Sequence, residues 1–153
     1  SSKYAFNHPD KFAGCACMSG VPSDIRKIMS EGPSNAFYAR EKITVEQAGG
    51  LEKYLASYEN VWDRVKEVAQ MENPPKFYFC CGDEDGVYPN WMHFREYAEQ
   101  VGLKAVFDVR PGYGHEWRFW EMELQEILKF FGFDRGQVKT EPKPGKRPDG
   151  TLV

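Results

Sequence analysis

The chain has 153 residues, of which 41% are hydrophobic, so it is long and apolar enough to form one domain with a buried core. Its formal net charge of -3 comes from 20 Lys and Arg residues against 23 Asp and Glu residues, interspersed along the chain. The lack of a long basic run argues against nucleic acid as a partner. The lack of about 18 consecutive apolar residues argues against a membrane-spanning helix.

The first residues predict the end of a helix followed by a buried strand. Residues 2–7 have the pattern of a helix that stops at the His8-Pro9 step, because proline cannot continue it. We therefore expect the chain to be truncated, since it opens inside a helix. The short apolar run 12–18 follows and ends at Ser19-Gly20, which is typical of a strand covered on both faces.

The four cysteines form two close pairs inside apolar runs, Cys15 with Cys17 and Cys80 with Cys81. A disulfide between such near neighbours strains a strand, so we expect buried, reduced thiols. Zinc is less favoured, because its sites prefer C-x2-C pairs in turns. Reduced thiols suit a cytoplasmic protein, although a signal peptide on a missing N-terminal part would leave the localisation open.

The segment from about 24 to 60 predicts an irregular, cap-like insertion outside the core. It contains the breaks Gly32-Pro33 and Gly49-Gly50 and only short helical patterns. From 61 to 71 the apolar residues recur at helical spacing, and Asn73-Pro74-Pro75 ends this helix before the next strand.

Two further strands, 76–81 and 104–109, are each followed by a helix. The alternation of strands and helices predicts a mostly parallel sheet with helices on both faces. The predicted domain covers residues 1–134, and the Pro- and Lys-rich residues 135–153 are expected to form a flexible tail. The buried stripe of the last helix is expected to consist of Trp120, Leu124, Ile127, Leu128 and Phe131.

Two loops carry the candidate functional residues, CGDEDG at 81–86 and PGYGHEW at 111–117. Each follows a strand, and parallel strands bring their carboxyl ends to one edge of the sheet, so Asp83, Glu84 or Asp85 can approach His115. A carboxylate beside a histidine fixes the tautomer of the ring while its other nitrogen takes a proton from a nucleophile. The structural alternatives are an acidic turn and a histidine that caps the last helix.

The sequence indicates no metal and no cofactor. His8 precedes a proline at the end of a helix, and His93 falls on a helix without an acid at the spacing of a ligand. No H-x3-H or H-E-x-x-H pattern occurs, so surface or structural roles are favoured for both.

Three sequence blocks together resemble an esterase family of α/β-hydrolases that includes tributyrin esterases, feruloyl and acetylxylan esterases and S-formylglutathione hydrolases. The blocks are KYAFNHPDKFAG with MSG, then FYFCCGDEDGVYPN, then PGYGHEWRFWEMEL. The pairing of G-x-E-D after one strand with G-x-H-x-W-x-x-W after the next is fairly specific. The resemblance implies the fold class: α/β, the C-terminal half of an α/β-hydrolase, with a mostly parallel sheet, flanking helices and a small irregular cap-like insertion.

The resemblance also assigns site residues. It places the triad acid on Asp85 and the triad base on His115, and it matches Trp117 and Trp120 to aromatic residues that contact substrate. Asp83 is the alternative acid, at a position where the family more often has threonine or serine.

The nucleophile of such an enzyme is not found in this sequence. No G-x-S-x-G occurs, and Ser1 and Ser2 fall where the helix after the nucleophile is already under way. We therefore expect the chain to be inactive without an N-terminal half. Because three strands would leave an apolar sheet edge open, we expect pairing with that missing half or self-association.

The function expected from the resemblance is that of a serine carboxylesterase acting on a small acyl ester or on an acylated or feruloylated sugar. The alternatives are a non-catalytic binding or assembly module with the hydrolase scaffold, and an acyltransferase that uses the same triad. Aromatic residues of the insertion can contact the ester or only pack the insertion itself; they are Phe37, Tyr38, Tyr54 and Tyr58.

Overall fold

The computed structural model describes residues 1–133, and the expected tail at 135–153 lies outside them. Its centre is a parallel sheet of three strands in the order β1-β2-β3. The strands are β1 (Gly14–Met18), β2 (Lys76–Gly82) and β3 (Ala105–Arg110). All three therefore end at the same edge, as the alternation of strands and helices predicts.

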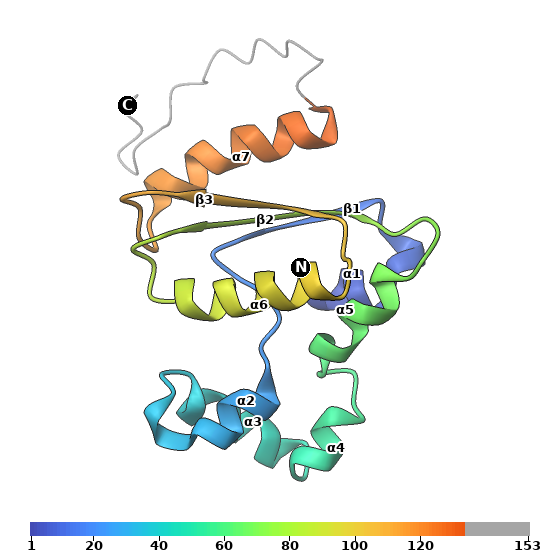
Figure 1. Ribbon diagram of the computed structural model, residues 1–153, viewed down its shortest axis with the longest axis vertical. Helices are drawn as coiled ribbons and strands as arrows, with labels where there is room; N and C mark the ends of the chain where they lie inside the picture. The colour runs from blue at the N-terminus through green and yellow to red at the C-terminus, as the bar shows by residue number, and fades with distance from the viewer. Residues whose placement is uncertain (134–153) are drawn as a thin grey trace, which may run out of the picture.

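Helices cover both faces of the sheet (Figure 1). On one face lie α1 (Ser2–Asn7), α5 (Val61–Ala69) and α6 (Tyr88–Gln100), and α7 (Trp117–Phe131) lies on the other. Helix α1 ends at Asn7, as the His8-Pro9 step predicts, and the 3-10 turn η1 (Pro9–Lys11) joins it to β1.

The larger core fills the space between the sheet and α1, α5 and α6. Phe79 of the central strand is fully buried and touches rings from three elements: Phe77 on its own strand, Phe94 on α6 and Phe107 on β3. Strand β2 is almost wholly apolar because helices cover both of its sides.

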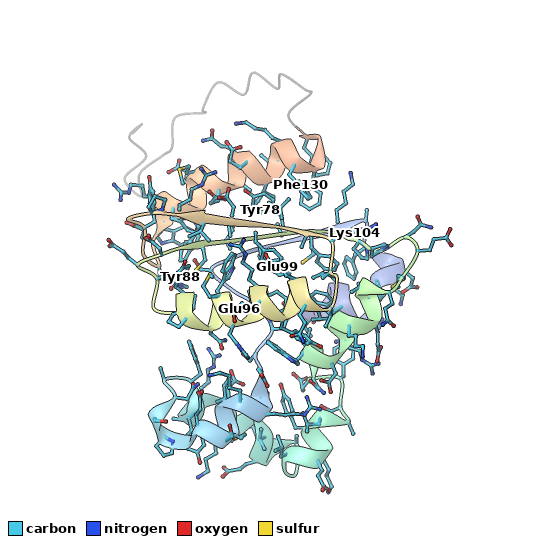
Figure 2. The ribbon with its side chains drawn as sticks, viewed as in Figure 1. Tyr78, Tyr88, Glu96, Glu99, Lys104 and Phe130 are labelled. Carbon is cyan, nitrogen blue, oxygen red and sulfur yellow. The ribbon has the colours of Figure 1, made fainter. Side chains whose placement is uncertain are left out.

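The smaller core, between the sheet and α7, contains a buried polar network. Glu123 is fully buried and accepts hydrogen bonds from Arg110 Nε at 2.7 Å and from Tyr78 OH at 3.1 Å. The Tyr78 hydroxyl also lies 2.9 Å from Asp108 Oδ2. Burial and the two acidic partners raise the pKa of Tyr78. Figure 2 labels Tyr78 on the sheet and Phe130 on α7, whose ring centroids are 5.4 Å apart.

This network corrects the expected stripe of α7. Leu124 and Leu128 are 47% and 41% exposed, whereas Phe119 and Glu123 are buried. A prediction from hydrophobicity alone does not find the buried face of α7, because Glu123 lies at its centre and its charge is compensated by Arg110.

Residues 24–60 form a small helical lobe at the lower end of Figure 1. It is more regular than its sequence indicates, with α2 (Ile25–Glu31), η2 (Gly32–Ser34), α3 (Tyr38–Gln47) and α4 (Leu51–Leu55). Its helices are short and separated by glycines, which hides the periodicity. The lobe has its own small core of Ile25, Ile28, Val45 and Tyr54.

Polar contacts attach the lobe to the rest of the chain. Arg26 of α2 forms a bidentate salt bridge with Asp63 of α5, with both N–O distances at 2.8 Å. The Arg26 guanidinium lowers the pKa of the Asp63 carboxyl. Asp24 caps α2 by accepting from Lys27 N, and its other oxygen lies 3.0 Å from Nε2 of His93 on α6.

All four cysteines are free thiols. The closest pair, Cys15 and Cys17, has a sulfur–sulfur distance of 3.8 Å. Among residues 1–133, none of the helices combines the length and the apolar character that a membrane crossing requires.

We predict that Phe79→Ala lowers the free energy of unfolding by about 3–5 kcal/mol, because it opens a cavity at the centre of the larger core. Chemical denaturation monitored by circular dichroism measures the change. The control is Tyr4→Ala at a side chain that is 59% exposed, where a change within about 0.5 kcal/mol is expected. Equal losses for the two variants would contradict this description of the core.

Candidate functional site

The loops that follow β2 and β3 are bound to each other through their backbones. Asp83 N donates to Arg110 O at 3.1 Å, and Glu84 N donates to Tyr113 O at 3.0 Å. The Asp83 carboxylate accepts a third hydrogen bond from Gly112 N at 2.8 Å. These bonds fix how the loop 83–87 lies against the loop 111–116.

Gly82 makes this close approach possible. A Cβ atom at this position would lie 2.0 Å from Tyr113 O and 2.5 Å from Tyr113 C, a distance that real side chains do not tolerate. The last residue of β2 must therefore be a glycine because another backbone passes directly over it.

The joined loops bring Asp85 and His115 together. Asp85 Oδ2 lies 2.9 Å from His115 Nδ1, and Oδ1 lies 3.3 Å from the same nitrogen. Oδ1 also accepts from the backbone N of Val87 at 3.0 Å, which holds the carboxylate in place. The Asp85 side chain is 1% exposed and the His115 side chain is 55% exposed, so the acid is inside and the ring faces outward.

The other two acids of the cluster lie apart from the histidine. Asp83 is exposed and bonds the backbone of the neighbouring loop, and Glu84 is exposed. Of the three acids that strand order alone left open, Asp85, to which the resemblance assigns the triad acid, is the one that contacts His115. His93 instead contacts Asp24 of the lobe.

The two tryptophans of α7 have different surroundings. Trp120 stands perpendicular to the His115 ring, with centroids 4.8 Å apart and an interplanar angle of 89°. Trp117 is 82% exposed and touches Trp120 edge-on at 5.1 Å. Trp120 Nε1 donates to Ser19 Oγ at 3.0 Å, so Ser19 at the end of β1 also belongs to the site. Sequence reasoning missed Ser19 as a site residue, although its position directly after a buried strand was a signal.

A small pocket of about 220 Å³ opens between the strand ends and the helical lobe. Ser19, which is hydrogen-bonded to Trp120, forms part of its wall. So does Val87, whose backbone N–H donates to Asp85. Phe37 and Arg40 of the lobe also line the pocket. The remaining lining residues are Gly20, Val21, Ser23 and Asn90.

The other lobe aromatics do not line this pocket. Tyr54 is buried in the lobe's own core and donates to Glu59 O at 3.1 Å, while Tyr38 packs beside that core. Tyr58 lies next to His8, with ring centroids 5.6 Å apart.

The Asp85–His115 pair has the arrangement of a general base. A proton on Nδ1 bonded to a buried carboxylate leaves Nε2 as the acceptor nitrogen. Within residues 1–133, the hydrogen bonds of the His115 ring involve Nδ1 alone, so Nε2 can accept a proton from a hydroxyl on its outer side. In the same range, no group of three or more His, Cys, Asp and Glu side chains is placed to hold a metal ion.

Comparison with solved structures defines the class of fold. FphF of Staphylococcus aureus, a fluorophosphonate-binding serine hydrolase in a substrate-bound structure, matches with a TM-score of 0.60 and 20% identity over 84% of this chain and 48% of its own. The S-formylglutathione hydrolase FrmB of the same organism matches with a TM-score of 0.56 and 18% identity over 85% and 45%. A ferulic acid esterase matches with a TM-score of 0.52 and 22% identity over 84% and 44%.

The chain therefore has an α/β-hydrolase fold and spans just under half the length of these proteins. The predicted fold class, the C-terminal half of an α/β-hydrolase with a parallel sheet and flanking helices, is confirmed. The similar structures are serine hydrolases and esterases, which agrees with the resemblance found in the sequence. No protein-family model and no curated protein matches the chain.

We predict that Gly82→Ala separates the two loops and breaks the Asp85–His115 contact, because the added methyl group would overlap the Tyr113 backbone. The free energy of unfolding should fall by about 2 kcal/mol or more. The imidazole resonances of His115 in NMR spectra should shift at the same time.

The matched control is Gly86→Ala in the same loop, where a Cβ atom would meet nothing within 4 Å. This variant should keep the histidine resonances and the stability of the parent chain. A Gly82→Ala chain with unchanged spectra would show that the loops do not depend on this close approach.

Proposed function

We propose that this chain is part of a serine carboxylesterase, to which it contributes the acid Asp85 and the base His115 of a Ser/His/Asp triad. The observation that supports the proposal most directly is the contact between a buried carboxylate and Nδ1 of an exposed imidazole at the strand ends. The serine hydrolases and esterases of the same fold support it independently.

In the proposed mechanism, His115 Nε2 takes the proton of a serine hydroxyl while the serine oxygen forms a bond to the ester carbonyl carbon. Asp85 holds the Nδ1 proton and stabilises the imidazolium that forms. The tetrahedral intermediate then collapses, the ester C–O bond breaks, and the Nε2 proton passes to the leaving alcohol. Water hydrolyses the acyl-enzyme by the same proton transfers.

In this proposal the nucleophile comes from a polypeptide segment outside this sequence, since the 153 residues contain no G-x-S-x-G motif. We propose that an N-terminal half supplies this serine and the oxyanion hole, and that it pairs with the open edge of β1. Without it the chain should be inactive. Self-association through the same edge is the alternative way to cover it.

The helical lobe is proposed to act as a cap over the substrate. Its Phe37 lines the pocket that reaches Ser19 and Val87, so the substrate would be a small acyl ester or the ester of an aromatic acid or a sugar. Trp117, whose side chain is the most exposed of the site aromatics, is a second candidate contact. The four free thiols favour a reducing compartment such as the cytoplasm.

A non-catalytic binding module is the second candidate function, and the missing nucleophile motif is the observation that favours it. Acyl transfer to another acceptor would use the same proton transfers as hydrolysis. Product analysis in water with and without an added alcohol distinguishes those two reactions.

We predict that the chain joined to its N-terminal half hydrolyses p-nitrophenyl acetate, and that the chain alone does not. In the joined protein, His115→Ala and Asp85→Asn should each lower kcat by about 10,000-fold, because the first removes the base and the second favours the wrong tautomer. Release of p-nitrophenol measures the rate.

His8→Gln is the control, since His8 lies at the end of α1 next to Tyr58 and should not affect the rate. If the joined protein is active and His115→Ala keeps full activity, the role proposed for His115 is wrong. If a well-folded joined protein binds ligands but never turns over an ester, the binding module is the better description.

A further inference from the structure

Ser19 has an unusual backbone conformation for its residue type. Among residues 1–133 it is the one non-glycine residue with a positive φ, at 53°. This left-handed region costs free energy for any residue with a Cβ atom, and glycine occupies it without that cost.

The side chain gives a reason for serine at this place. Ser19 is buried, its backbone N donates to Cys80 O at 2.9 Å, and its hydroxyl accepts the indole N–H of Trp120 at 3.0 Å. This hydrogen bond joins the C-terminal end of β1 to the first turn of α7, although Ser19 and Trp120 are 101 positions apart in the sequence. A strained backbone that supports one specific side-chain bond is typical of a functional site.

Trp120 passes this constraint to His115. The Trp120 ring stands perpendicular to the imidazole, with ring centroids 4.8 Å apart. Among residues 1–133, Asp85 is the one hydrogen-bond partner of the His115 ring. A single hydrogen-bonded partner at Nδ1 leaves the ring free to tilt about that bond. The indole limits this tilt, and the Ser19 hydroxyl fixes the indole.

We propose that Ser19 is a positioning residue that sets the direction of His115 Nε2 through Trp120. This inference rests on the proposed function, because the direction of Nε2 matters when it must meet a serine hydroxyl. A displacement of about 1 Å at such a group can cost 100-fold in rate. Substrate affinity does not depend on the ring direction, so KM should stay constant while kcat falls.

The test is Ser19→Gly, which removes the hydroxyl and relieves the positive φ. The thermal midpoint should change little, because relief of the positive φ offsets the lost hydrogen bond to Trp120, while kcat of the joined protein falls about 10-fold. A purely structural serine would change neither kcat nor the His115 resonances.

Trp120→Phe is the partner variant, because it keeps an aromatic ring and loses the N–H donor. If both residues act through one hydrogen bond, the double variant should be no slower than the slower single variant. Ser30→Ala, at an exposed serine that bonds within α2, is the control and should leave rate and spectra unchanged.

The outcomes separate this inference from the proposed function. Constant kcat and constant His115 resonances in Ser19→Gly would overturn the inference, and so would multiplicative losses in the double variant. If the joined protein has no esterase activity at all, the proposed function fails and the catalytic meaning of the contact fails with it. The NMR spectra of the chain then still decide whether Ser19 sets the His115 ring.

Discussion

The site depends on the close approach of two loop backbones at the ends of β2 and β3. Gly82 leaves room for the Tyr113 carbonyl, and the hydrogen bonds of Asp83 and Glu84 then hold the loops in one register. Two side chains 30 positions apart thereby come within hydrogen-bond distance. A parallel sheet provides this because each strand ends at the same edge, where neighbouring loops can carry chemistry without disturbing the core.

The polar network under α7 supports the same site from the other side. Glu123 sits in a low-dielectric interior, and its charge is tolerable because Arg110 and Tyr78 both donate to it. Its hydrogen bonds fix the rotation of α7 about its own axis. That rotation places Trp120, one turn earlier on the helix, against His115 rather than in solvent. Burying the charged groups of this network costs desolvation free energy, but the network fixes the position of Trp120 beside His115.

The sequence was informative where the signal is local. The strand before Ser19, the strand before Asp83 and the helix that begins at Trp117 follow from apolar runs and from the residues that interrupt them. The proximity of the acidic loop to His115 also followed, because parallel strands leave few alternatives. The helices of the lobe were harder to predict from the sequence. They are short and separated by glycines, so each has too few apolar residues to show a helical period.

What could not be predicted depends on pairing between distant residues. Glu123 reads as a surface residue on any hydrophobicity scale, and its burial makes sense after Arg110 is seen beside it. Strand order alone does not choose between Asp83 and Asp85, because both are acids of one short turn; the family resemblance favours Asp85, and the loop geometry places that carboxylate against His115. The position of Ser19 after a buried strand is visible in the sequence, but its positive φ and its hydrogen bond to Trp120 are not, and the proposed positioning role depends on both.

The distribution of burial across the site is consistent with division of one active centre between two halves. Asp85, which needs a dry and rigid setting to orient an imidazole, is enclosed by this chain, whereas the His115 ring faces outward. A base that were already buried here would have no free side from which a nucleophile could approach. In the proposed esterase, this chain would therefore supply the preorganised acid and base and would leave Nε2 of His115 accessible to the serine of an N-terminal half.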